Sequence, residues 1–174
     1  GKNKVPGILS FATPRELARL LFRMEQGKLV DEWSSLQMKK YLYMTKRRYR
    51  YAYAPELAGS AVYFKSGSLY SCEKEEGFRC GKYLGNVRNM MNSAAIVETP
   101  PTTMSPAQTV SQVSAQERPL HYIATLMSNV SRVNSAWDHS RIAAAVHETM
   151  RTRSLQALAE GAPVELMEEA GKSD

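Results

Sequence analysis

The sequence predicts an α+β domain, in which two helices precede a three-stranded antiparallel sheet and a final helix packs back on that sheet. Three observations predict it: helix start and stop signals near the N-terminus, three strand-like segments in a row, and a helical pattern after the last of them. In chain order the expected elements are helices at about 14–26 and 31–44, strands at about 60–71, 89–98 and 119–128, and a helix at about 135–152.

The first helix has clear signals at both ends. In "TPRELARLLFRMEQG", Thr13 is a capping residue, Pro14 suits the first helical position, Glu16 completes a capping box and Gly27 supplies the stop. Apolar residues at helical spacing then form one stripe, comprising Leu17, Leu20, Leu21 and Met24.

The second helix, from about Asp31 to Met44, is less cleanly patterned and carries Trp33, Leu36 and Leu42. It leads into the basic, tyrosine-rich segment "TKRRYRYAYAPELAG". Large aromatic residues usually pack against a core, so Trp33 and, in the last helix, Trp137 are expected to be packing anchors.

The first strand candidate contains one residue that does not match its surroundings. In "AGSAVYFKSGSLYSC", Lys65 interrupts an apolar run. A buried ammonium group is costly unless it is paired, so Lys65 is expected either to reach the edge of the sheet or to serve a site.

Two segments are expected to lie outside the regular elements. The connection at 99–118, rich in Pro, Thr, Ser and Gln, predicts a long exposed loop or flexible insertion. Gly161 and Pro163 break the C-terminal segment into short pieces. The predicted organisation is therefore one domain over residues 1–152 and an acidic tail over 153–174.

Composition fits a globular protein with one core. The chain has 174 residues, of which 43% are hydrophobic and 23% charged. Its net charge is +6, and residues 155–174 carry a net −4, which leaves +10 for residues 1–154. A basic body permits binding to nucleic acid, anionic lipid or acidic small molecules. No stretch approaches the roughly 18 apolar residues of a membrane helix, and "GKNKVPGILS" lacks the apolar region of a signal peptide.

The two cysteines, Cys72 and Cys80, are separated by "EKEEGFR". This spacing suits a disulfide across a hairpin loop, and two reduced loop cysteines are the alternative. Zinc would need four ligands, and the three histidines show no ligand spacing around the pair, so no metal site is predicted. A disulfide would indicate an oxidising compartment, periplasmic or secreted.

Strand-embedded "FKSGS", preceded by the "TPRELARLL" helix and followed by two strands and "VNSAWDHSRIAAAVHE", resembles the C-terminal part of class A β-lactamases and related penicillin-recognising serine hydrolases. The resemblance covers roughly residues 11–152. It implies the C-terminal half of a β-lactamase-like fold, following the loop that carries the general-base Glu. It also implies acyl-enzyme chemistry on β-lactam or D-alanyl peptide type amides, without a cofactor.

The resemblance assigns roles to four consecutive residues. Lys65 would supply positive potential and order proton transfer, and Ser66 would hydrogen-bond the substrate carboxylate. Gly67 would let the substrate backbone approach closely. The backbone N–H of Ser68 would be one of two oxyanion-hole donors.

The rest of the family's machinery is absent from the sequence. The nucleophile of the family lies in Ser-x-x-Lys at a helix N-terminus, and a Ser-x-Asn loop accompanies it. The literal match "SCEK", Ser71 to Lys74, lies among turn residues and is interpreted as chance, and Ser-x-Asn does not occur. The expected partner is therefore an N-terminal half of the same domain, as a separate chain or a missing segment.

Two other functions remain open. One is a catalytically inactive binding or sensor domain on the same fold. The other is nucleic-acid binding through "KRRYRYAY" at 46–53, where basic residues alternate with tyrosines suited to stacking on bases. The triad residue types at 138–140, "DHS", are neighbours on a helix and do not converge, so they are expected to be capping and surface residues. His147 is expected to be a packed or half-exposed helix residue rather than a ligand.

Overall fold

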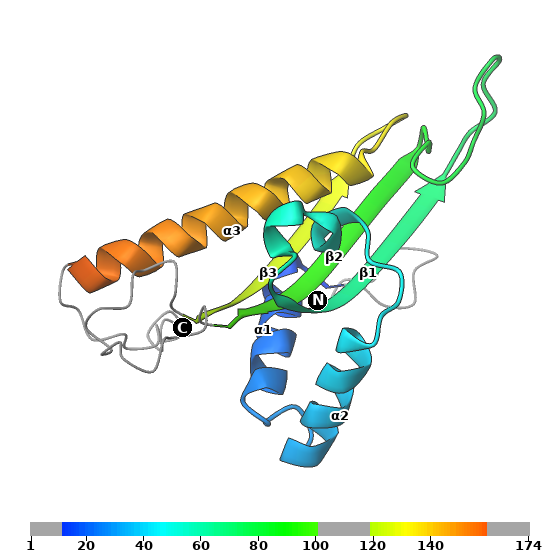
Figure 1. Ribbon diagram of the computed structural model, residues 1–174. Helices are drawn as coiled ribbons and strands as arrows, with labels where there is room; N and C mark the ends of the chain where they lie inside the picture. Colours follow the sequence, from blue (N-terminus) through cyan, green and yellow to red (C-terminus); the bar gives the residue numbers. More distant parts are fainter. Residues whose placement is uncertain (1–11, 101–118, 160–174) are drawn as a thin grey trace, which may run out of the picture.

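The computed structural model describes residues 12–100 and 119–159 (Figure 1). Its elements, in order, are α1 (Pro14–Glu25), α2 (Glu32–Tyr43), the short 3-10 helices η1 (Arg50–Tyr53) and η2 (Pro55–Leu57), strands β1 (Ala61–Ser71), β2 (Arg88–Thr99) and β3 (Leu120–Asn129), and α3 (Ala136–Ala159). The α+β class and the antiparallel sheet are confirmed.

The N-terminal helices begin and end where their sequence signals lie. The Thr13 side chain accepts a hydrogen bond from the Glu16 backbone N–H, and the Glu16 carboxylate accepts one from the Thr13 N–H, which completes the capping box. Gly27 follows the helix with φ +70°, a conformation that favours glycine. Asp31 then caps α2 through the N–H of Ser34.

The sheet has the order β1-β2-β3, with both pairs antiparallel. The central strand, β2, is buried on both faces from Ser93 to Val97, whereas β1 and β3 are each paired on one side within the described residues. The sheet therefore has two strand edges to which no described strand is paired.

Helices cover both faces of this sheet (Figure 1). On one face η1, η2 and α3 pack over a core that includes Phe64 and Val97. On the other face α1 packs on β3 and α2 on β1, over Ala94 and Ile96. Because successive strand residues alternate between faces, neighbouring residues of one strand belong to different cores.

The C-terminal helix is longer than the sequence pattern predicted. It continues to Ala159 instead of ending near residue 152, so residues 153–159 are helical. The rest of the tail and most of the predicted insertion, residues 101–118, lie outside the described residues. Among the described helices, none combines the length and hydropathy needed to cross a membrane.

The two tryptophans are not packing anchors, and that prediction was wrong. Trp33 is 71% exposed and Trp137 is 61% exposed. The α2 side chains that reach the sheet are Met38 and Leu42. Trp33 precedes Leu42 by nine residues, which places it on the opposite side of the helix at about 100° per residue.

Candidate functional site

The four residues singled out by sequence lie together on β1, the strand at one edge of the sheet. Lys65 and Ser68 are exposed, and Ser66 and Gly67 are half-buried. In the register Lys65 pairs with Ala94, which belongs to the core under α1 and α2, so Lys65 and Gly67 share that face. Ser66 and Ser68 point to the opposite face.

The structure explains how Lys65 is accommodated in an apolar strand. Its ammonium group is exposed at the sheet edge and donates a hydrogen bond to the Ser66 carbonyl oxygen. Lys65 therefore avoids the cost of an unpaired buried charge. Lys65 thus reaches the edge of the sheet, which was one of the two expectations for it, and its role in a site stays a prediction.

A hollow of about 490 Å³ adjoins this segment on the α1 and α2 face. Its polar wall includes Lys65, Gly67 and Asn92, and its other wall is formed by leucine and methionine side chains of the two helices. The Asn92 Oδ1 atom is buried without a hydrogen-bond partner among the described residues. The hollow thus combines an apolar wall with a few polar groups along β1 and β2, as ligand pockets do.

Arg50 lies directly behind the segment and was not recognised from sequence as a site residue. Its side chain is 2% exposed. The guanidinium group donates hydrogen bonds to the carbonyl oxygens of Gly67 and Asn92 and to the Tyr83 hydroxyl. No carboxylate of the described residues lies within ion-pair distance of it, so a buried positive charge faces the back of β1.

Further positive charge gathers around Tyr49. The Arg50 guanidinium lies 5.1 Å and the Lys82 ammonium 5.3 Å from the centre of the Tyr49 ring. A hydrogen bond with Ser66 lowers the pKa of Tyr49, and Lys82, Arg50 and Lys65 act in the same direction against the effect of burial. The surroundings of Ser66 are therefore electropositive, which suits an anionic ligand.

The strand leads into a hairpin that projects beyond the sheet (Figure 1). A disulfide joins Cys72 to Cys80, with 6.0 Å between their Cα atoms, as the hairpin spacing had suggested. Ser71 is the last residue of β1, and residues 72–75 are not helical. The "SCEK" segment therefore lacks the helical turn that would place Lys74 beside Ser71.

The histidines of α3 are buried structural residues. His139 Nδ1 lies 3.2 Å from the Ser93 hydroxyl and Nε2 lies 2.8 Å from the Ser128 hydroxyl. Burial, followed by the charge of Arg50, lowers the pKa of His139. His139 and Ser140 were expected to be surface residues, and that prediction was wrong: they are 2% and 4% exposed.

His147 is packed, which is one of the two positions expected for it. Its side chain is 2% exposed, and its Nδ1 atom lies 3.1 Å from the Tyr122 hydroxyl. Burial, followed by the charge of Arg151, lowers the pKa of His147. The two α3 histidines thus pack in the core under the sheet rather than in an open cleft.

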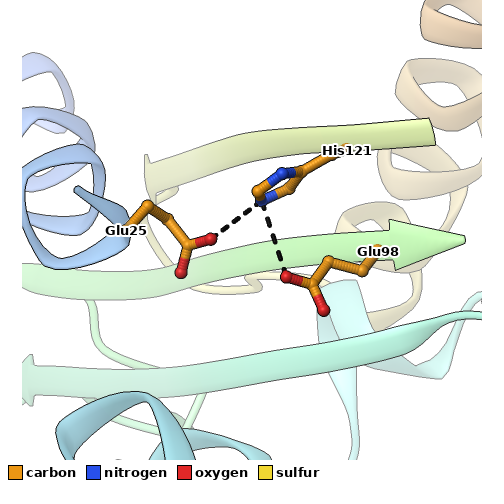
Figure 2. A group of neighbouring side chains, drawn as sticks. All are labelled: Glu25, Glu98 and His121. Carbon is orange, nitrogen blue, oxygen red and sulfur yellow. Dashed lines mark ion pairs between the residues drawn. The ribbon is translucent and has the colours of Figure 1, made fainter. Parts of the chain in front are cut away.

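A second polar cluster lies where α1 ends beside β2 and β3 (Figure 2). His121 Nε2 lies 2.9 Å from Glu25 Oε2 and 3.8 Å from Glu98 Oε1. The Lys39 ammonium pairs with both carboxylates. The sequence pattern gave no sign of this group, because its members come from four separate elements and no spacing rule connects them.

Together these observations define an α+β domain with a largely apolar hollow, lined by Lys65 and Asn92 at one sheet edge. Basic residues gather around Tyr49 beside Ser66, and a carboxylate–histidine cluster lies elsewhere. No family model and no curated protein matches the chain.

Proposed function

We propose that the chain is the C-terminal segment of a β-lactamase-like serine hydrolase. Such an enzyme would act through an acyl-enzyme on β-lactam or D-alanyl peptide type amides, and this chain would supply the Lys-Ser-Gly strand. One observation carries the proposal: Lys65–Ser68 occupy an edge strand of an antiparallel sheet. The helices on either side follow in the order that the resemblance implies.

The electrostatics of the strand support an anionic substrate. Lys65 is exposed at the edge, and the buried Arg50 guanidinium lies against the carbonyl of Gly67. A carboxylate held by the Ser66 hydroxyl and an oxyanion held by the Ser68 N–H would both be stabilised by this positive potential. The hollow, whose lining includes Ser66 as well as Lys65 and Gly67, offers room for a small substrate.

The nucleophile would come from an N-terminal half of the same domain. The described residues leave one side of β3 unpaired, and apolar side chains of α1 and α2 such as Leu20, Phe22 and Leu36 are exposed. A partner segment that adds strands and helices would cover both features. The Cys72–Cys80 disulfide favours an oxidising compartment, so we place the protein in the periplasm or outside the cell.

A catalytically inactive binding or sensor domain is the second candidate. It is favoured by the lack of a Ser-x-x-Lys at a helix N-terminus in the described residues. Nucleic-acid binding through 46–53 has less support, because Arg50 and Tyr51 are buried and cannot contact a strand outside the protein.

Labelling with a fluorescent penicillin distinguishes these candidates. The complete native protein is incubated with the reagent and digested, and the labelled peptide is identified by mass spectrometry. We expect a covalent adduct on a serine of a Ser-x-x-Lys sequence outside this chain. Saturable binding without an adduct would replace the enzyme with the sensor, and an adduct on Ser71 would show that the strand end carries the nucleophile.

A further inference from the structure

The cluster of Glu25, Glu98 and His121 has the composition and size of a metal site (Figure 2). One oxygen from each carboxylate and one imidazole nitrogen lie within 4.8 Å of one another. Ligands on tetrahedral Zn²⁺ at about 2.0–2.1 Å are separated from one another by roughly 3.3 Å. The 2.9 Å and 3.8 Å separations from His121 Nε2 bracket this value, so small side-chain shifts would bring the three atoms around one ion.

Glu25 provides an independent indication that a ligand is missing. Its side chain is 9% exposed, and its carboxylate points into the cluster from the last residue of α1 (Figure 2). The Oε1 atom is buried and has no hydrogen-bond partner in the described part of the chain. Buried carboxylate oxygens are normally satisfied. A water molecule bound to a metal ion at this site would donate a hydrogen bond to Oε1 and satisfy this atom.

In this structure the Lys39 ammonium group lies where a metal ion would bind to the two carboxylates. Its ammonium group lies 2.9 Å from Glu25 Oε2, bonds to Glu98 Oε1 and lies 4.5 Å from the centre of the Tyr63 ring. Burial lowers the pKa of Lys39, but its hydrogen bonds and ion pairs with Glu98 and Glu25 outweigh this effect and raise it. Lys39 has a flexible side chain, 19% exposed, which can leave the carboxylates for solvent.

The cluster is open to solvent on one side and supported on the other. A hollow of about 630 Å³ is lined by Glu98 and His121, and His121 itself is 51% exposed. The Tyr63 hydroxyl donates to the other oxygen of Glu98 at 2.7 Å, which fixes the orientation of that carboxylate as an outer-shell partner does in metal sites.

We propose that Glu25, Glu98 and His121 bind a first-row divalent cation of the Zn²⁺ type, which displaces the Lys39 ammonium. Two carboxylates and a neutral imidazole suit such an ion, and a water molecule from the adjoining hollow completes its shell. The ion ties the end of α1 to β2 and β3, so its binding stabilises the fold. This inference is independent of the proposed hydrolase activity.

The test is titration of the chelator-treated, intact protein with ZnCl₂ at neutral pH, followed by calorimetry and thermal unfolding. We expect one equivalent to bind with a rise in melting temperature, and Co²⁺ to give the visible absorption of a tetrahedral site. Lys39→Met should tighten binding by about tenfold or more, because no competing cation has to leave. Lys40→Met, an exposed neighbour on α2, is the matched control and should bind as the wild type does.

Two variants locate the ion. His121→Ala removes a half-exposed ligand and Glu25→Gln preserves the shape of the side chain, so both should fold, as circular dichroism will verify. Each should abolish stoichiometric binding. Binding that survives His121→Ala, or binding in Lys39→Met but not in the wild type, would overturn the proposal, as would the absence of binding in both.

Discussion

Among single residues, Arg50 does most to connect the fold with the candidate site. It adopts φ 59°, in the left-handed region that non-glycine residues rarely occupy, at the start of η1. From there its guanidinium bonds to carbonyl oxygens on both β1 and β2. A residue in this strained conformation persists where the surrounding structure holds it, and the buried hydrogen bonds of the guanidinium group hold Arg50 here.

We expect Arg50→Met to lower the free energy of unfolding by about 2–4 kcal/mol, because it removes the buried hydrogen bonds of the guanidinium group to the Gly67 and Asn92 carbonyl oxygens and its bonds to the Tyr83 hydroxyl. Arg47→Met, at an exposed position of the same segment, should change it by less than about 0.5 kcal/mol. Urea unfolding followed by circular dichroism measures both. Equal effects of the two substitutions would show that the Arg50 contacts contribute nothing.

The sequence singled out some residues of the candidate site and not others, for identifiable reasons. Lys65 was found because a charge inside an apolar strand is a local anomaly. Arg50 was missed because it is one of four basic residues in "KRRYRYAY", and nothing local distinguishes the one that is buried. The partners of His121 are brought to it by tertiary packing, which no spacing in the sequence encodes.

Among helices and strands, the predicted bounds were accurate where the sequence carries local start or stop signals. The start of α1 was predicted to the residue because Thr13, Pro14 and Glu16 form a capping box. The three strands were predicted to within about a residue at each end. The predicted end of α3, near residue 152, was too early. The apolar residues lose their helical spacing after Met150, but "RTRSLQALA" contains no helix-breaking residue, and the first one is Gly161.

The disulfide hairpin after β1 gives a prediction at this scale. Replacing Cys72 and Cys80 together by Ser should lower the free energy of unfolding by about 2 to 3 kcal/mol, because the loop is no longer closed in the unfolded chain. Thermal or urea unfolding of the oxidised wild type and the double variant measures the difference. Reductant should produce the same loss in the wild type and none in the variant. A variant as stable as the oxidised wild type would contradict the expectation.

In the molecule as a whole, helices cover both faces of the sheet, but the two outer strands are each paired on one side only among the described residues. The two edge strands differ in what they offer: β1 presents Lys65–Ser68, and β3 presents an unpaired side among the described residues. The sequence predicted the helix that packs back on the sheet but not that α1 and α2 cover the other face. The core that each strand side chain joins depends on the strand register, and the register is defined only when the strands pair.

We propose that Lys65 lies in a cleft where a serine of the complete protein is acylated. The most direct measurement is the rate of covalent labelling of the complete protein by a fluorescent penicillin, for the wild type, Lys65→Ala and Arg47→Ala. We expect Lys65→Ala to slow acylation by about 100-fold or more, because positive potential at the strand edge stabilises both the substrate carboxylate and the developing oxyanion. Arg47→Ala, which removes an exposed cation of the segment before η1, should label within a few-fold of the wild-type rate. Acylation of Lys65→Ala at the wild-type rate would contradict the assignment of this strand to the active site.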